Sequence, residues 1–160
     1  MSVSFSPTAQ AKFEEILRRY PVRRAAIMPT LWLAQQEFGY ISLETMEYIA
    51  GLLQLSPAFV ASVASFYTMY YKQPMGKHHV QVCTNLSCAL LGADEILACL
   101  ERRLGIKVGQ TDEQRQFSLS EVECLASCGT APMMQINDEY CESLTPERTL
   151  EIIDRLARGS

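Results

Sequence analysis

Two runs of sequence, Val82-Cys83-Thr84-Asn85-Leu86-Ser87-Cys88 and Glu123-Cys124-Leu125-Ala126-Ser127-Cys128, decide the fold of this chain of 160 residues. Residues 79–83 and 117–122 each predict a β-strand. Each cysteine pair therefore begins where one of these strands ends in a loop. A loop can direct two sulfur atoms to one site, whereas neighbouring residues of a strand point to opposite faces. We therefore expect a sheet that presents four thiols at one edge.

The sequence around these runs predicts a small sheet flanked by helices. Between the two pairs, residues 89–104 have the apolar spacing of an amphipathic helix. After the second pair, residues 133–136 and 139–141 are expected to form a hairpin that turns at Asn137-Asp138. Thr145-Pro146 marks the start of a last helix. This order of strand, helix, strand, hairpin and helix favours a central sheet with flanking helices.

The N-terminal half of the chain predicts only helices. Ser6-Pro7 and Ser56-Pro57 are N-caps followed by a first-turn proline. A helix is expected over residues 30–38, and Ser42 should cap the next one. The inner faces of the last two helices are expected to carry Leu43, Met46, Ala50 and Leu53, and then Val60, Val63 and Phe66 or Tyr67.

The change of pattern near residue 74 divides the chain. We predict an α+β fold class, with an N-terminal helical bundle over residues 1–73 and a second domain with a short central sheet over residues 74–160. The run Lys72-Gln73-Pro74-Met75-Gly76 is typical of a linker or turn between them.

Residues 48–71 contain no charged side chain, and such a stretch is long enough to span a bilayer. Gly51, Gln54 and Ser56-Pro57 interrupt it in the middle, however, and start a new helix there. We therefore expect two short helices buried in the bundle or against a partner, and no direct membrane span.

The composition argues against several functional classes. A net charge of −4 leaves no basic excess to neutralise phosphates, so we expect no nucleic-acid partner. No basic-then-apolar segment opens the sequence as an export signal would, and a cytoplasmic location is expected. In that compartment, six cysteines are thiolate ligands or reduced core residues rather than disulfides.

Four thiols in two loops suit an iron–sulfur cluster or a zinc ion. Four residues separate the cysteines of the first pair and three those of the second, a whole helix lies between the pairs, and neither loop contains a charged residue. A [2Fe–2S] cluster with four thiolates is anionic, and it needs backbone N–H groups and hydroxyls directed at its sulfurs. These features favour the cluster, while structural zinc, thiol chemistry and inert cysteines remain open from spacing alone.

Two further cysteines lie outside the loops. Cys99 falls within the expected helix and Cys141 within a short strand, and both are interpreted as small buried apolar residues. No base, nucleophile or open metal position is recognised, so no catalytic residue is predicted.

Several further motifs accompany the two cysteine runs: Ser65-Phe66-Tyr67-Thr68-Met69, Pro74 with Gly76-Lys77-His78, Phe117-Ser118-Leu119 and Ala131-Pro132. Together these motifs resemble the thioredoxin-like [2Fe–2S] ferredoxin family, and the resemblance covers about residues 13–156. Within that family, they are most similar to the small ferredoxin subunits of respiratory NADH:quinone oxidoreductase (complex I).

The resemblance implies that the second domain is a thioredoxin-like α/β domain holding one [2Fe–2S] cluster. Cys83, Cys88, Cys124 and Cys128 match the family's four ligands, the first pair on one iron and the second pair on the other. It also implies a flavin- and NADH-binding partner subunit, with FMN on that partner and not on this chain. Further subunits of the complex would complete the assembly.

On this resemblance the chain is a subunit of an oxidoreductase that performs no independent catalysis. Its cluster would exchange single electrons with the partner's flavin, and the chain would lie peripherally on the inner face of the cell membrane through partner subunits. Two alternatives remain at this stage. One is the equivalent ferredoxin subunit of an NAD-linked hydrogenase or formate dehydrogenase, and the other is a zinc-stabilised interaction module with no redox role.

Overall fold

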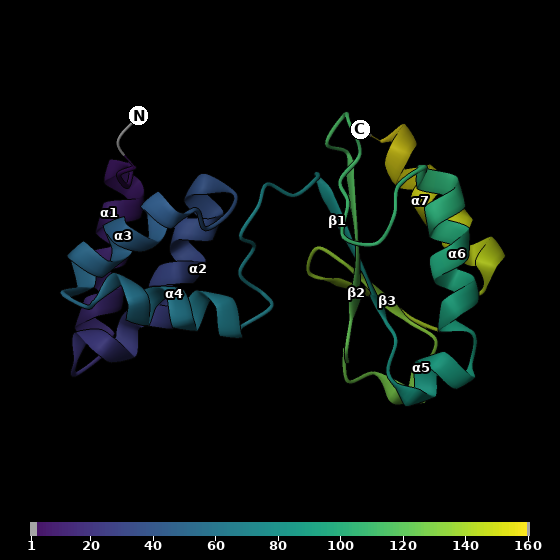
Figure 1. The fold of residues 1–160 in the computed structure, drawn as a ribbon, viewed down its shortest axis with the longest axis horizontal. Coiled ribbons are helices and arrows are strands. Elements are labelled where there is room, and N and C mark those ends of the chain that lie inside the picture. The colour runs from purple at the N-terminus through teal and green to yellow at the C-terminus, as the bar shows by residue number, and fades with distance from the viewer. Residues whose placement is uncertain (1–2, 160) are drawn as a thin grey trace. The chain divides into compact units, whose positions relative to one another are not determined.

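The computed structural model describes residues 3–159, which form two compact units separated between Pro74 and Met75. The first unit is helical, and the second combines helices with a sheet (Figure 1). The α+β fold class predicted from the sequence is confirmed.

The first unit consists of four α-helices and one short 3₁₀ helix. Their bounds are α1 Pro7–Arg19, η1 Arg23–Ala26, α2 Ile27–Phe38, α3 Leu43–Leu53 and α4 Pro57–Phe66. The hydroxyls of Ser6, Ser42 and Ser56 each accept a hydrogen bond from the backbone N–H three residues later, at 3.1–3.3 Å. The predicted N-caps of α1, α3 and α4 are therefore confirmed.

Helix α2 begins three residues before the expected start at Thr30. Pro29 lies in its first turn, where a missing backbone N–H breaks no helical hydrogen bond, so the proline does not have to precede the helix. Gly39 ends α2 with a φ of 83°, a left-handed conformation that glycine adopts without steric cost.

Some residues expected on the inner faces of these helices are exposed. Leu43, the first residue of α3, is 74% exposed. Phe66, the last residue of α4, is 78% exposed, and the alternative Tyr67 is exposed as well. Met46, Ala50, Leu53 and Val60 are buried as predicted. The apolar spacing is thus correct for most of α3 and fails at the start of α3 and the end of α4.

The segment after α4 is fixed by buried side chains of α2. Gln35 is buried, its Nε2 donates to the Met69 carbonyl at 2.9 Å, and its Oε1 accepts from the Tyr71 backbone N–H at 2.6 Å. Tyr70 is fully buried and its hydroxyl donates to the Met28 carbonyl at 2.9 Å. Residues 69–71 are therefore held by hydrogen bonds that satisfy buried polar groups.

Within residues 3–159, no single helix is long and apolar enough to cross a membrane. Helices α3 and α4 together have the required length and composition, but the chain bends by 120° at the break between them.

The second unit is built on a four-stranded sheet in the order β2-β1-β3-β4. Strands β1 and β2 are parallel, whereas β1–β3 and β3–β4 are antiparallel. The bounds are β1 His78–Cys83, α5 Leu86–Leu90, α6 Ala93–Leu104, β2 Phe117–Val122, η2 Cys128–Thr130, β3 Met134–Ile136, β4 Glu139–Cys141 and α7 Pro146–Arg158. The predicted strands, the hairpin at Asn137-Asp138 and the last helix are confirmed.

The single helix expected over residues 89–104 is wrong, because the structure contains two helices there. Gly92 has a φ of 101° and separates the short α5 from α6. An apolar repeat does not reveal this break, since Leu90 and Leu91 continue it in the sequence although both are exposed. The break places Cys88 on α5 rather than in a flexible loop.

Helices α6 and α7 cover one face of the sheet (Figure 1). Ile96 and Leu100 of α6 and Ile153 of α7 belong to one buried apolar cluster. The sheet contributes Val80, Val82, Phe117, Leu119, Met134 and Ile136 to the same cluster. Burial of these apolar side chains stabilises the sheet from which the two cysteine loops start.

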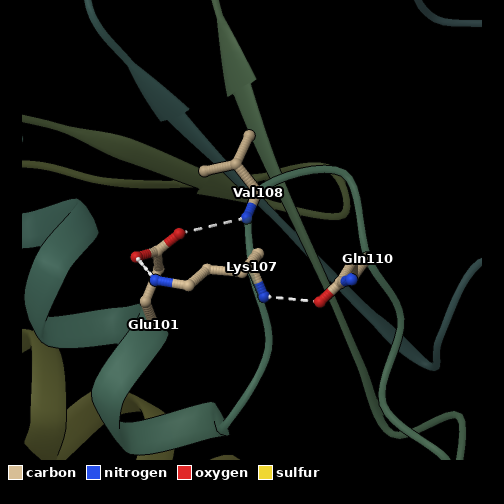
Figure 2. Close-up of polar contacts among 4 residues, drawn as sticks. All are labelled: Glu101, Lys107, Val108 and Gln110. Carbon is tan, nitrogen blue, oxygen red and sulfur yellow. Dashed lines mark hydrogen bonds and ion pairs between the residues drawn. The ribbon is translucent and has the colours of Figure 1, made fainter.

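The connection from α6 to β2 is tied back to α6 by one carboxylate (Figure 2). Glu101 accepts hydrogen bonds from Lys107 Nζ at 2.8 Å and from the Val108 backbone N–H at 3.3 Å. The Lys107 backbone N–H in turn donates to Gln110 Oε1 at 2.8 Å. The hydrogen bond from Lys107 is the main cause that lowers the pKa of Glu101, so this carboxylate stays ionised at neutral pH.

Gly76, just before β1, lies directly against the backbone of β2. Its backbone N–H donates to Ser118 Oγ at 2.7 Å, and a Cβ built on it would approach the Phe117 carbonyl carbon to 2.7 Å. Two backbone segments can come this close only where one residue has no side chain.

We predict that Gly76→Ala destabilises the second unit by about 1–3 kcal/mol, because the methyl group displaces backbone rather than a flexible side chain. Urea unfolding of the full chain measures this change. The matched control is Gly51→Ala, where a Cβ meets nothing within 4 Å inside α3, and roughly 0.5–1 kcal/mol of added stability is expected. Equal stability of the two variants would contradict the close approach at Gly76.

His79 of β1 is a buried imidazole whose Nε2 lies 2.7 Å from Ser120 Oγ. Burial lowers the pKa of His79 from 6.5 to about 4. The unfolded chain therefore binds a proton at pH values where the folded chain does not.

This difference predicts that stability falls as the pH decreases from 6.5 towards 4, by up to about 3 kcal/mol from His79 alone. His79→Gln keeps a polar group near Ser120 but does not titrate. Its unfolding free energy should therefore change less with pH over this window than that of the unaltered chain. Parallel pH profiles for the two proteins would show that His79 does not titrate in the way the burial requires.

Candidate metal centre

The parallel pairing of β1 and β2 brings the two cysteine runs to the same end of the sheet. Cys83, the last residue of β1, is opposite Val122, the last residue of β2. The pairing extends one residue further, since the Thr84 backbone N–H donates to the Val122 carbonyl at 3.1 Å. Cys124 follows two residues after β2, so both ligand runs start from neighbouring strand ends.

The first pair is buried. Cys83 and Cys88 are both buried and belong to a small apolar cluster with Ala93 and Met133, against which Leu125 of the second loop packs. Asn85 supplies the N-cap of α5, with its Oδ1 accepting from the Leu86 backbone N–H at 2.8 Å. The turn of helix that carries Cys88 is thereby fixed next to Cys83.

The second pair is exposed. Cys124 and Cys128 are accessible to solvent, and Cys128 begins the short helix η2. Between them, Ala126 adopts a left-handed backbone with a φ of 59°, and its N–H donates to Cys124 Sγ at 3.3 Å. The conformation of this loop thus directs a backbone donor at a cysteine sulfur, as an anionic cluster requires.

The sulfur of Cys83 lies among hydrogen-bond donors from both loops. Burial raises the pKa of the Cys83 thiol, but the backbone N–H groups of Asn85 and Leu125, with contributions from the thiols of Cys88 and Cys124, lower this pKa overall. Leu125 belongs to the second run, so this donor joins the two loops at one sulfur. These donors therefore reduce the electrostatic cost of negative charge on the Cys83 sulfur.

The pKa of the Cys88 thiol is shifted in the opposite direction, above its ordinary value. Burial is the main cause that raises the pKa of its thiol, and the neighbouring Cys83 and the charge of Cys128 raise this pKa further. A hydrogen bond from the Met133 backbone N–H lowers the pKa in part. The thiols of the two pairs therefore influence one another, with Cys83 next to Cys124 and Cys88 next to Cys128. Positive charge at this point would stabilise all four as thiolates.

Three hydroxyls near the cysteines are bonded to carboxylates. Thr84 Oγ1 donates to Glu121 Oε1 at 2.9 Å, and the hydroxyls of Ser127 and Thr130 donate to Glu142. Hydroxyl groups form stronger hydrogen bonds to a carboxylate than to a thiol, so nearby acidic side chains accept them. The backbone N–H groups of Asn85, Leu125 and Ala126 are the main-chain donors directed at the sulfurs of Cys83 and Cys124.

Sequence reasoning missed these carboxylates and a tyrosine. Tyr140 lies in the middle of β4, and Glu142 directly follows this strand. The Tyr140 hydroxyl donates to the Leu125 carbonyl at 2.8 Å. Both residues are 12 or more positions away from the loop residues that they contact. Only the antiparallel pairing of β3 and β4 brings them there, and no local pattern signals it.

Cys99 and Cys141 lie on α6 and β4, outside the two cysteine runs. Cys99 is buried on α6 with its sulfur 3.8 Å from the Pro146 carbonyl oxygen. Cys141 is partly buried against the apolar cluster of the sheet, and burial raises the pKa of its thiol. The interpretation as a buried apolar residue agrees with the surroundings of Cys99, whereas Cys141 is only partly buried. The Ala131–Pro132 peptide bond, just after η2, is cis.

The donor set can be tested against the two candidate metal groups. Among residues 3–159, no three Cys, His, Asp or Glu side chains gather closely enough to hold a single ion. Structural zinc needs four donors around one ion, whereas a [2Fe–2S] cluster distributes four thiolates over two iron atoms. Two pairs of thiols at neighbouring strand ends, supported by backbone N–H donors, fit the four-thiolate ligand set of such a cluster.

Comparison with known proteins gives a consistent result. The model of a family described as thioredoxin-like [2Fe–2S] ferredoxin matches residues 13–157. The chain is 44% identical to a protein of Rickettsia conorii that is named as a subunit of NADH-quinone oxidoreductase, over 89% of this chain and 87% of that protein. It is also 43% identical to the mitochondrial NADH dehydrogenase [ubiquinone] flavoprotein 2 of Dictyostelium discoideum, over 95% of this chain and 63% of that protein.

A solved structure, that of an air-oxidised NAD⁺-reducing [NiFe]-hydrogenase, superimposes on 83% of this chain with a TM-score of 0.73. The sequence identity is 17%, and the match covers 23% of the hydrogenase chain. At this identity, the likeness shows a shared fold and carries no statement about activity.

Proposed function

Because this chain belongs to the thioredoxin-like [2Fe–2S] ferredoxin family, we propose that it is the one-electron carrier subunit of an NADH:quinone oxidoreductase. The family match covers nearly the whole chain, and two relatives above 40% identity are named as components of such dehydrogenases. The single observation that carries the proposal is the meeting of two cysteine pairs at the ends of two parallel strands.

The proposed ligands are Cys83, Cys88, Cys124 and Cys128, the first pair on one iron and the second pair on the other. A bound [2Fe–2S] cluster supplies a site that accepts and releases one electron without making or breaking bonds to a substrate. The chain's own part is to hold the four sulfurs and to direct backbone N–H groups at them. The donors to Cys83 and Cys124 reduce the electrostatic cost of negative charge there.

The difference in exposure between the pairs supports a direction for electron exchange. Cys83 and Cys88 are covered by the core of the unit, whereas Cys124 and Cys128 face solvent. The proposed electron path to the partner's flavin passes on the side of the exposed second pair. FMN and NADH would bind to that partner subunit, and this chain would reach the inner face of the cell membrane through it and the other subunits.

The alternative assignments receive less support. The hydrogenase resemblance rests on a shared fold at 17% identity, whereas relatives above 40% identity are named as components of NADH-quinone oxidoreductase or NADH dehydrogenase. The family match is to [2Fe–2S] ferredoxins and gives no support to a zinc-stabilised module. Co-purification of the full complex identifies the partner: a flavoprotein that oxidises NADH supports the proposal, and a hydrogenase or formate dehydrogenase subunit contradicts it.

We predict that a single substitution by Ala at any of the four proposed ligand positions abolishes or rearranges the cluster, because one iron then loses one of its two protein ligands. The visible absorption of the purified protein measures this loss. Matched controls are Cys99→Ala and Cys141→Ala, which should keep the spectrum of the unaltered protein. An unchanged spectrum in all four ligand variants, or its loss in the Cys99 variant alone, would contradict the assignment.

A further inference from the structure

The second cysteine loop is held on its outer side by the end of the β3–β4 hairpin. The Tyr140 hydroxyl donates to the Leu125 carbonyl at 2.8 Å, one residue after Cys124. Glu142, two residues further along the chain, accepts at one oxygen, Oε1, from the hydroxyls of Ser127 and Thr130. The Thr130 contact measures 2.7 Å.

These contacts surround one proposed ligand. Ser127 directly precedes Cys128, and Thr130 follows it by two residues, so a single carboxylate is bonded to the chain on both sides of that sulfur. The hydrogen bonds from Ser127 and then Thr130 lower the pKa of Glu142, so it is ionised at neutral pH and forms the stronger, charge-assisted kind of hydrogen bond.

Two backbone hydrogen bonds after Glu142 also join the end of the hairpin to the residues that follow Cys128. The Ser143 N–H donates to the Thr130 carbonyl at 2.7 Å, and the Leu144 N–H donates to the Pro132 carbonyl at 2.9 Å. The first cysteine pair does not need such a connection, because Cys83 ends a core strand and Cys88 is buried. The cysteines of the second pair are exposed, and only Leu125 between them packs against the apolar cluster, so hydrogen bonds to the hairpin supply further support.

We propose that Glu142 is a positioning residue for the cluster: its carboxylate fixes the loop around Cys128 by binding the Ser127 and Thr130 hydroxyls. Glu142 acts through these two side chains and is not itself a ligand. This inference rests on the proposed function, since it takes Cys128 as a ligand of the cluster.

The experiment compares Glu142→Ala and Glu142→Gln in the full-length chain purified with its cluster. Transfer of iron to a coloured chelator measures how readily the cluster is released, and the EPR spectrum of the dithionite-reduced protein reports the geometry at the ligand sulfurs. Loss of charge-assisted hydrogen bonds predicts about tenfold faster release for Glu142→Ala. The EPR line shape should also change. Glu142→Gln retains a carbonyl acceptor and should fall between Glu142→Ala and the unaltered protein.

Glu123→Gln is the matched control. Glu123 is exposed next to Cys124, and it takes part in no hydrogen bond or ion pair of residues 3–159. Its neutralisation removes a negative charge near the cluster without releasing a loop, so release rate and line shape should stay as in the unaltered protein. Equal effects of Glu123→Gln and Glu142→Gln would mean that charge alone matters and would overturn the positioning role.

A second variant covers the case in which Glu142→Ala does not fold. The double substitution Ser127→Ala and Thr130→Val removes the same hydrogen bonds from the loop side and leaves the hairpin intact, and it should reproduce the fast release and the altered EPR spectrum. Release and spectra that match the unaltered protein would overturn the inference. An unaltered protein that holds no cluster would instead contradict the proposed function, so the two failures are distinguishable.

Discussion

The parallel pairing of β1 with β2 is the constraint on which the proposed site depends. Two strands that run in the same direction, side by side, must end at the same edge of the sheet. The register sets Cys83 opposite Val122, and the loops that leave there carry all four proposed ligands. The two strands are separated in the sequence by α5, α6 and a long connection, which Glu101 ties back to α6.

The two cysteine pairs obtain their rigidity from different sources. The first pair is fixed by burial, between the end of a core strand and the turn of helix that Asn85 caps. The second pair is exposed and depends on polar contacts with the β3–β4 hairpin. This difference follows from what each pair must do in the proposed function. One side of the cluster would be closed by the protein core, and the other would remain open to an electron-transfer partner.

Much of this arrangement could be predicted from the sequence because its signals are local. Serine caps, the strand at 117–122 and the turn at Asn137-Asp138 all depend on neighbouring residues, and the structure contains each of them. The features that sequence reasoning missed depend on contacts between distant residues. The break at Gly92 and the exposure of Leu43 and Phe66 are decided by packing, and the bonds of loop hydroxyls to Glu121 and Glu142 are decided by topology.

The central claim is that this chain brings four thiolates together to hold one [2Fe–2S] cluster. Its most direct test is an iron and acid-labile sulfide analysis of the purified chain, with EPR spectra before and after dithionite reduction. The account predicts about two iron atoms and about two sulfides per chain, with an EPR signal that appears only on reduction. Colourless protein with one zinc ion per chain and no signal after reduction would contradict it.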